Sequence, residues 1–583
     1  MAALIQRHVA SNLADANFPP DLSPMLSRVF MARGARCSDD IDLSMSSLLS
    51  PSLLMGIDGA ADLIIAAMES NSRILIVGDF DADGATSCAL AIRAFEAMGH
   101  SDVRFIVPNR FEYGYGLTPE IVDLAKPQNP SLIITVDNGI SSIDGVAAAR
   151  AAGIDVLVTD HHLPGHQLPD ANVIVNPNQH GCEFPSKALA GVGVIFYVMS
   201  AVRAGLRKKQ WFNDQRKEPN MADFLDLVAL GTVADVVPLD KNNRILVEQG
   251  LRRIRVGKCS AGIRALIEVS GRSAAKLIAS DMGFALGPRL NAAGRLDDIS
   301  IGIACLLTND VAMAKDIATE LDSMNQDRRQ IEQGMQVQAE TALARLEQDK
   351  STELPIGMCL FNDEWHQGVV GILASRIKDL HQRPVICFAL ANDSEDCSEL
   401  KGSARSIKGF HIRDALDAVA AHNPGLIDKF GGHAMAAGLS LKKDKFADFA
   451  KAFDKEASRL LTEDDLQSCV MSDGALAPDE ISIDNATLIH YATPWGQLFP
   501  EPIFDNEFLL VQQRIVGSKH LKLVLGMDDG SGQIVDAIAF NIDIKAWPDE
   551  SVKKVRAAYR LDVNRFRGQE TVQLIIEHLE KVN

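Results

Sequence analysis

The chain has 583 residues, too many for one hydrophobic core, and its length predicts about three or four domains. Hydrophobic residues make up 47% and charged residues 23%, which is ordinary for a soluble globular protein. The net charge of −19 argues against a protein that binds nucleic acid over its whole surface, but it leaves room for a local basic groove.

Residues 1–50 are predicted to form a proline-containing, partly helical extension. The N-terminus (MAALIQRHVASNL) lacks the basic segment and apolar run of a secretory signal. No stretch approaches the roughly 20 apolar residues that span a bilayer. We therefore expect a cytoplasmic protein that does not contact a membrane.

Residues 51–310 have the alternating pattern of an α/β domain. Short apolar runs rich in β-branched residues are typical of buried parallel strands, and alanine-rich stretches between them are typical of helices. The predicted strands are 74–77, 132–136 and 156–158, the predicted helices are 85–98 and 145–152, and 206–218 is predicted to be a charged loop.

Three further segments follow. Apolar residues at helical spacing in 311–350 predict a long exposed helix that joins two domains. Residues 351–460 form a second α/β unit. Residues 461–583 start as an acidic linker and then alternate in short strands (HLKLVLGM, QIVDAIAF, AAYRLDVNRF, TVQLIIEHL), which predicts a small β-barrel.

The strongest chemical signal is GDFDADGATS at 78–87, where Asp79, Asp81 and Asp83 follow a predicted strand. Alternate residues of an extended chain point to the same side, so we expect three carboxylates to be presented together. The edge of the sheet where parallel strands end is where open α/β sheets bind ligands. Like charges so close together repel unless a cation lies between them.

Three weaker signals lie further along. Asp137 ends the strand of TVDNGI, and Asp160, His161 and His162 end the strand of VTDHH. Asp235 is the one acid in the apolar run GTVADVVPL, where a buried carboxylate needs a cation or a donor. Each of these signals alone could have a purely structural role, such as capping a turn or forming a polar loop.

Together these signals indicate a metal site. Several carboxylates with one or two imidazoles suit Mg²⁺ or Mn²⁺, and there are enough ligands for two ions. The nine cysteines are scattered without CxxC spacing, so no zinc ribbon is indicated. A site with two metal ions activates water for displacement at phosphorus.

These motifs resemble those of the DHH phosphoesterases, a family named for the triplet that stands here at 160–162. The stretches GGHAMAAG (431–438) and GSARSI (402–407) resemble the DHH-associated domain. Four more stretches resemble the RecJ exonucleases within that superfamily: VPNRFEYGYGL (107–117), LAGVGV (189–194), GPRLNAAGR (287–295) and NRFRGQETVQL (564–574). The resemblance covers nearly the whole chain from about residue 45.

The resemblance implies roles for particular residues. The metal ligands would be Asp79, Asp81, Asp83, Asp137, His161 and Asp235, with Asp79 serving either as a ligand or as an acid behind the ligands. His162 would face the scissile phosphate, and Asp160 would orient a histidine. Residues in the strand-binding cleft would be Arg110, Arg289, Asn291 and Arg295, and a phosphate would be held by Ser403, Arg405, Gly432 and His433.

The C-terminal barrel would then be an OB-fold that binds single strands, with Lys519, Arg565, Phe566 and Arg567 as candidate contacts. For Phe566, a position in the barrel core is as good an interpretation as a contact with the strand. The implied function is a 5′→3′ single-stranded DNA exonuclease in DNA repair and recombination, which uses two Mn²⁺ or Mg²⁺ ions and releases mononucleotides. A monomer is expected, and a single-strand-binding protein is a candidate partner.

Two alternatives stay open. The first is a DHH phosphodiesterase that cleaves short oligonucleotides or cyclic dinucleotides, for which the two α/β domains suffice and the barrel is superfluous. The second is a nuclease-like scaffold that binds single strands without cutting them, and lost metal ligands would mark it. None of the expected ligands is lost in this sequence.

Overall fold

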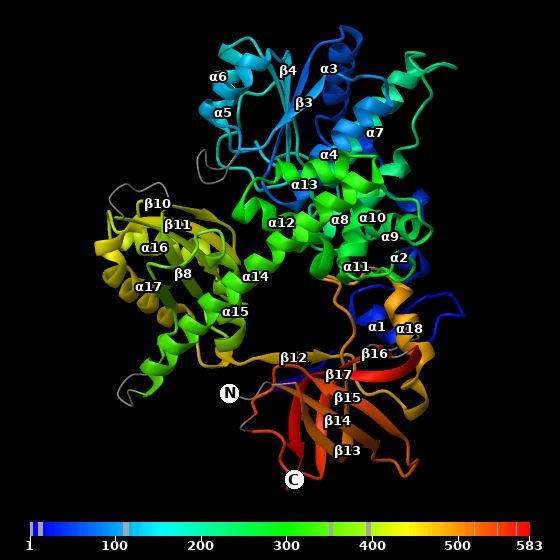
Figure 1. Cartoon of the computed structure of the whole chain (residues 1–583), viewed down its shortest axis with the longest axis vertical. Coiled ribbons are helices and arrows are strands. Elements are labelled where there is room, and N and C mark those ends of the chain that lie inside the picture. Colours follow the sequence, from blue (N-terminus) through cyan, green and yellow to red (C-terminus); the bar gives the residue numbers. More distant parts are fainter. Residues whose placement is uncertain are drawn as a thin grey trace.

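A computed structural model describes residues 4–9, 15–108, 116–348, 354–391, 398–517, 519–544, 546–566 and 568–582, without the side chains of 345–348 and 566. Figure 1 shows three lobes: a large α/β lobe, a smaller α/β lobe joined to it by the long helix α14, and a β-barrel near both chain ends. The predicted fold class, two α/β units with a long connecting helix and a C-terminal barrel, is confirmed.

The large lobe is built on a parallel sheet of five strands in the order β3-β2-β4-β5-β6. Helices α3, α4 and α7 pack on one face, and α5 and α6 pack on the other. The strands are rich in Ile, Leu and Val because both faces of the sheet are covered. Their bounds are β2 Ile74–Gly78, β3 Val103–Ile106, β4 Leu132–Val136, β5 Asp155–Thr159 and β6 Val173–Val175.

Two helix ends differ from the sequence prediction. Helix α4 begins at Ala82, three residues earlier than expected, because Asp81 caps it. Helix α7 continues to Lys208, so the expected charged loop at 206–218 begins only after that residue. The helices around the sheet are α3 Ile57–Glu69, α4 Ala82–Ala97, α5 Pro119–Ala125, α6 Ile143–Ala151 and α7 Gly191–Lys208.

A second group of helices extends the large lobe below the sheet (Figure 1). It comprises α8 Leu225–Ala234, α9 Lys241–Arg255, α10 Ala261–Val269, α11 Ala279–Asp281, α12 Gly287–Leu296 and α13 Ser300–Leu307. Helix α14, Val311–Gln348, has 38 residues and is therefore about 57 Å long. It packs on α10, α12 and α13 at its start and on α15 further along, so it joins the two α/β lobes.

The smaller lobe has a mixed sheet in the order β10-β11-β9-β8-β7. Its strands are β7 Met358–Phe361, β8 Val385–Leu390, β9 Glu399–Arg405, β10 Lys429–Gly432 and β11 Ala436–Lys442. Its helices are α15 Val370–His381, α16 Ile412–His422 and α17 Phe446–Leu460. The phenylalanines of α17 fill the core on one side of this sheet.

The C-terminal lobe is a closed barrel of five strands in the order β13-β14-β15-β17-β16. The last four strands were predicted from the sequence, whereas β13 was not. The bounds are β13 Phe504–Val516, β14 His520–Met527, β15 Ile534–Ala539, β16 Lys554–Phe566 and β17 Gln569–Val582. The barrel core is continuous with the core of the large lobe.

The N-terminal segment holds the lobes together. Strand β1, Leu4–Arg7, pairs in parallel with β12, Cys469–Ser472, inside the segment expected to be a plain linker. Helix α1, Pro24–Ala32, contributes Phe30, which stacks near Trp495 after α18, Ile483–Ala492.

Among the described residues, no single helix is both long and apolar enough to cross a bilayer. One bent pair, Met45–Leu53 with Ile57–Glu69, meets that criterion by length and composition alone.

Candidate metal centre and strand cleft

Three aspartates lie close together where β2 ends and α4 begins, but not because the chain stays extended. Asp79 follows β2, Asp81 is the N-cap residue of α4, and Asp83 lies in the first turn of that helix. The Asp81 carboxylate accepts hydrogen bonds from the backbone N–H groups of Asp83 and Gly84 at 2.9 and 3.0 Å. The expectation that alternation along an extended segment presents these carboxylates is therefore wrong; a helix start presents them.

Asp83 is held by the start of another helix. Its two carboxylate oxygens accept from the backbone N–H groups of Gly191 and Val192, at 2.7 and 2.9 Å. These are the first residues of α7, whose N-cap residue Ala190 makes no capping hydrogen bond with its side chain. Asp83 thus satisfies N–H groups that a cap would otherwise take, and the positive end of the helix favours its charge.

Asp137 follows β4 in a left-handed conformation, with φ of 63°. This conformation is uncommon for residues other than glycine, although Asp tolerates it better than most. Helix α7 approaches so closely that a Cβ atom on Gly191 would lie 2.6 Å from the Asp137 side chain. Glycine at 191 is therefore required for α7 to start between Asp83 and Asp137.

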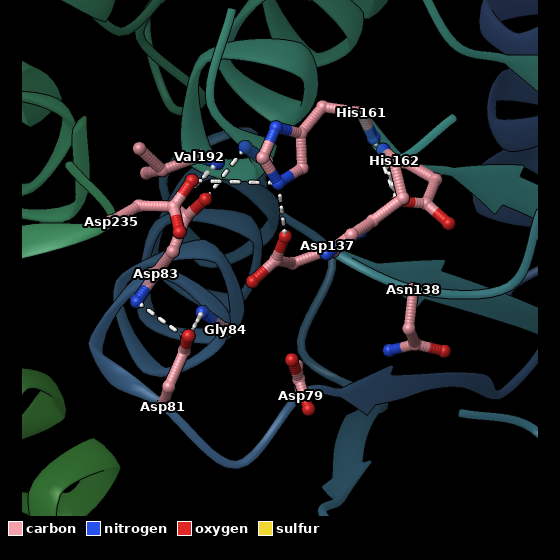
Figure 2. Close-up of polar contacts among 12 residues, drawn as sticks. Asp79, Asp81, Asp83, Gly84, Asp137, Asn138, His161, His162, Val192 and Asp235 are labelled. Atoms are coloured by element: carbon pink, nitrogen blue, oxygen red, sulfur yellow. Dashed lines mark hydrogen bonds and ion pairs between the residues drawn. The ribbon is translucent and has the colours of Figure 1, made fainter. Parts of the chain in front are cut away.

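His161 faces these carboxylates (Figure 2). Its Nε2 lies 3.1 Å from an Asp137 oxygen and 3.5 Å from an Asp235 oxygen. Burial lowers the pKa of His161 to about 4, so the ring is neutral near pH 7. The ring also donates to the Leu189 backbone carbonyl, and in the described part of the chain Nε2 makes no hydrogen bond. Nε2 of the neutral ring therefore presents its lone pair towards the carboxyl groups of Asp137 and Asp235.

Asp235 is the C-cap residue of α8, and its side chain is only 22% exposed. Burial raises its pKa to about 7, and the negative charge of Asp81 adds to this effect. Burial, followed by the neighbouring aspartates, also raises the pKa of Asp83 and Asp137 well above the usual range. When they are ionised, the carboxylates of this cluster therefore repel one another.

Asp160 and His162 form a pair at the edge of this cluster. One Asp160 oxygen accepts from the backbone N–H of His161 and His162 and lies 2.8 Å from His162 Nδ1. The other oxygen accepts from the backbone N–H of Ile140 at 2.8 Å. Burial lowers the pKa of His162, but the hydrogen bond to Asp160 and the nearby acids outweigh it and raise the pKa to about 9. The ring is therefore cationic near pH 7.

The donor atoms form overlapping groups that fit divalent cations. Within each group, one ligand atom from every residue lies within 4.8 Å of the others. The lone pair of His161 and the excess of buried carboxylates are what a hard cation such as Mn²⁺ or Mg²⁺ would neutralise. The groups are Asp79, Asp81 and Asp137; Asp83, His161 and Asp235; and Asp137, His161 and His162. Asp137 and His161 each belong to two groups, so the groups overlap and would hold two ions close together.

The smaller lobe faces this centre across a cleft. The ring of His433 stacks near that of His162, with centroids 6.3 Å apart, and Gly432 lines the same cleft of about 1260 Å³. Ser403 and Arg405 lie on β9, and an Arg405 N–H donates to the Ser403 hydroxyl at 3.1 Å. A Cβ atom on Gly371, in the first turn of α15, would lie 2.8 Å from that hydroxyl oxygen. A serine, an arginine and a helix start therefore meet here, as they do in anion sites.

The structure places the other expected cleft residues in different surroundings. Arg289 is buried and forms an ion pair with Asp322 of α14 at 2.6 Å. The Asn291 side chain accepts from the backbone N–H of Ala82 at 2.8 Å, at the start of α4. Arg295 donates to the Gly368 carbonyl at 3.1 Å, across the junction of the two lobes. Arg110 lies outside the described residues.

The expected strand contacts on the barrel are only partly described. Arg565 forms an ion pair with Glu570 at 2.9 Å, on the hairpin of β16 and β17. Lys519 is exposed at the start of β14. Arg567 and the side chain of Phe566 lie outside the described part of the chain, so the choice between stacking and core for Phe566 stays open.

Sequence reasoning missed the backbone groups that hold the site. These are the N–H groups of Ile140, Gly191 and Val192 and the carbonyl of Leu189. Nearly every residue type carries the same backbone N–H and carbonyl groups, so the residue types do not show which of these groups contact the site. The one available signal was the glycine pattern of LAGVGV at 189–194, which marked the segment without revealing what it contacts.

Comparison with known proteins gives three matched regions. Residues 73–232 match the DHH family, N-terminal domain. Residues 355–459 match the DHHA1 domain, and residues 472–578 match the RecJ OB domain. The three regions correspond to the three lobes.

Full-length relatives and solved structures agree with these matches. The chain is 55% identical to the single-stranded-DNA-specific exonuclease RecJ of Dickeya dadantii, over 97% of each chain. It is 53% identical to that of Escherichia coli, also over 97% of each chain. The crystal structure of RecJ with Mn²⁺ from Thermus thermophilus superposes with a TM-score of 0.77 at 28% identity, covering 98% of this chain and 80% of that one. The Mg²⁺ complex gives 0.73 at 27% identity, covering 98% and 79%.

Proposed function

Since the chain belongs to the RecJ family of single-stranded-DNA-specific exonucleases, we propose that it hydrolyses phosphodiester bonds from the 5′ end of a single strand and releases mononucleotides. The observation that carries the proposal is the cluster of five aspartates around the neutral His161. We place this activity in DNA repair and recombination.

Asp79, Asp81, Asp83, Asp137, His161 and Asp235 would hold two divalent ions, Mn²⁺ or Mg²⁺. When bound, such ions acidify an attacking water and offset the charge that develops on the leaving oxygen. The chain itself fixes the geometry of the ligands. The first N–H groups of α7 hold Asp83, and the Leu189 carbonyl fixes the ring of His161. Ligands held this way need little reorganisation during the reaction.

His162 would stabilise the scissile phosphate. Asp160 holds its Nδ1, which fixes the orientation of the cationic ring beside the cleft that His162 lines. A fixed cation beside a phosphate is worth most when negative charge builds up in the transition state. Asp160 acts through His162 and is therefore a positioning residue.

The polarity of digestion would depend on the second lobe. Ser403, Arg405 and the first turn of α15 form an anion site, and Gly432 and His433 lie between the lobes. We expect a 5′-terminal phosphate bound in that site to place the next phosphodiester at the metal centre. This arrangement explains both the release of mononucleotides and the 5′→3′ direction.

The two alternatives have less support. A phosphodiesterase for short oligonucleotides or cyclic dinucleotides would not use the barrel, yet here the barrel shares a continuous core with the large lobe. A binding scaffold without activity would not need six intact candidate ligands. We further propose that the enzyme works in the cytoplasm as a monomer, since every candidate ligand comes from one chain. A single-strand-binding protein remains a candidate partner.

Polarity and the anion site can be tested together. Strands of about 30 nucleotides that carry either a 5′-phosphate or a 5′-hydroxyl are digested with Mn²⁺, and a blocking group is placed on one end or the other. We expect mononucleotides, inhibition by the 5′ block only, and a preference for the 5′-phosphate. Arg405→Ala should remove that preference.

The matched control is Arg376→Ala, since Arg376 is a largely exposed arginine of the same lobe that pairs with Glu332. This control should keep the preference for the 5′-phosphate. Digestion that is stopped only by a 3′ block would refute the proposed direction. Release of long fragments would refute the terminal anion site.

A further inference from the structure

One part of this acidic chain is strongly basic. Residues 252–276 contain seven of the 58 Lys and Arg residues and only one, Glu268, of the 77 acidic residues. The segment covers the last turn of α9, all of α10 and the short turn after it. We name this surface the α9–α10 basic face; its residues are Arg252, Arg253, Lys258, Arg264, Arg272 and Lys276.

The face is accessible. Lys258, Arg264 and Arg272 are exposed, and Val256, two residues before Lys258, is 70% exposed. The arginines in the last turn of α9 have an ordinary structural role, because they complement the negative end of that helix. Arg264 donates to the Gly257 carbonyl just after α9 at 3.0 Å, but Lys258 and Arg272 lie beyond that turn, so helix capping does not explain them.

The face borders the barrel. Lys276 forms an ion pair with Glu570 of β17 at 3.0 Å, and the same carboxylate pairs with Arg565 at 2.9 Å. Arg272 pairs with Asp281 at 3.2 Å. The basic surface of the large lobe therefore reaches the barrel hairpin of β16 and β17 through a direct contact.

The face lies away from the metal centre. Helices α8 and α9 pack against each other, and Gly250 near the end of α9 lies against the Leu225 carbonyl at the start of α8. Asp235 caps the opposite end of α8, and ten residues of helix separate the two ends by about 15 Å. A single strand that keeps the roughly 3.4 Å spacing of stacked bases needs about four to five nucleotides to cover that distance.

Resting on the proposed function, we propose that the α9–α10 basic face binds the phosphate backbone of the substrate strand several nucleotides beyond the scissile bond. A chain with net charge −19 repels nucleic acid except where cations gather, and this face gathers them beside the barrel. The described part of the face offers no aromatic side chain, so it would hold phosphates without reading bases. The α9–α10 basic face thus adds contacts to the substrate strand beyond the cleavage site, which favours long substrates.

The test compares two matched double variants of the full chain. Lys258→Gln with Arg264→Gln removes two exposed charges from the face. Arg207→Gln with Lys208→Gln removes two exposed charges from the last turn of α7 and is the control. KM and kcat are measured with Mn²⁺ on a tetranucleotide, on a single strand of about 30 nucleotides, and on a hairpin with a tail of about six nucleotides, at several salt concentrations.

For the face variant we expect KM on the long strand to rise about 3- to 10-fold. The slope of log KM against log salt should fall by about 1.4, since each lost single-strand contact accounts for about 0.7. The tetranucleotide and the control should show no change. Melting curves check folding, and Lys258→Gln alone replaces the double variant if that variant unfolds.

Three results would overturn the proposal. An unchanged KM on the long strand would mean that the face does not contact the substrate. A rise confined to the tailed hairpin would assign the face to duplex backbone. An equal rise on the tetranucleotide would mean an indirect effect on the metal centre. Failure of the parent enzyme on every substrate would refute the proposed function instead, so the two failures can be told apart.

Discussion

Replacing Asp235 with Asn should make the metal-free protein more stable and the metal-loaded protein inactive. Asp235 sits among buried acids, and its pKa is raised from 3.8 to about 7 by burial and by Asp81. Because the folded-state pKa exceeds the unfolded-state value, the native state loses stability as pH rises from about 4 to about 7. Above pH 7 the native state has lost the full amount of stability.

The size of this loss of stability follows from the two pKa values of Asp235. At 1.36 kcal/mol per pH unit, the rise in pKa corresponds to about 4 kcal/mol, and neighbouring acids share part of it. We therefore expect Asp235→Asn to add about 2 to 4 kcal/mol at pH 8. For a lobe of some 250 residues, that is a rise in Tm of roughly 5 to 12 °C.

The assay is a thermal melt of chelator-treated protein at pH 8 and pH 5, with and without Mn²⁺. At pH 5 only about a third of this loss of stability is present, so the difference in Tm between the two proteins should be about a third of that at pH 8. Mn²⁺ should stabilise the parent far more than the variant, and the variant should lose exonuclease activity. A variant that melts at or below the parent at pH 8, or that keeps near-native activity with Mn²⁺, would refute the electrostatic account of this centre.

Three further changes test neighbouring parts of the structure. His162→Ala should lower kcat about 100-fold or more and change KM little, measured on short strands; a rise in KM at constant kcat would make it a ground-state contact. Gly191→Ala should weaken Mn²⁺ binding about 10- to 100-fold by calorimetry, because its Cβ would displace Asp137; unchanged affinity would contradict the close approach. Asp505→Asn should cost about 2 to 3 kcal/mol at pH 7, because Arg7 and Arg556 would lose the carboxylate that they share, and no loss of Tm would contradict this. Since the pKa of Asp505 is lowered to about 2, mainly by hydrogen bonds that outweigh burial, the parent should lose this advantage as pH falls from about 4 to 2, whereas the variant should not.

The chemistry of the site could be predicted from residue types because the ligands are side chains. Asp83 and Asp137 stand out in the sequence as acids next to apolar runs. Their geometry could not be predicted, because it depends on α7, which starts more than 50 residues after Asp137 and places its first N–H groups between them. A contact between a carboxylate and a distant backbone has no local signature.

The fold was predictable where hydrophobic periodicity is strong and local. The strands of the parallel sheet are continuous apolar runs, and α14 repeats apolar residues over ten turns. Strand β13 was missed because only part of it alternates clearly and many of its residues are exposed. The pairing of β1 with β12 joins segments more than 460 residues apart, and four residues on each side carry too little pattern to reveal it.

The negative charge of the chain, which argues against a nucleic-acid substrate, is partly a property of the metal centre itself. Five candidate ligands are aspartates, packed so closely that burial and mutual repulsion raise the pKa of three of them. Two divalent ions would supply four positive charges at that point, and the cationic His162 adds a fifth beside the cleft. These five positive charges offset the five carboxylates, so the surface met by a strand is close to neutral where cleavage occurs. The remaining negative charge is spread over the rest of the chain, so a strand binds only where cations gather, and an acidic chain can act on an acidic polymer without binding it everywhere.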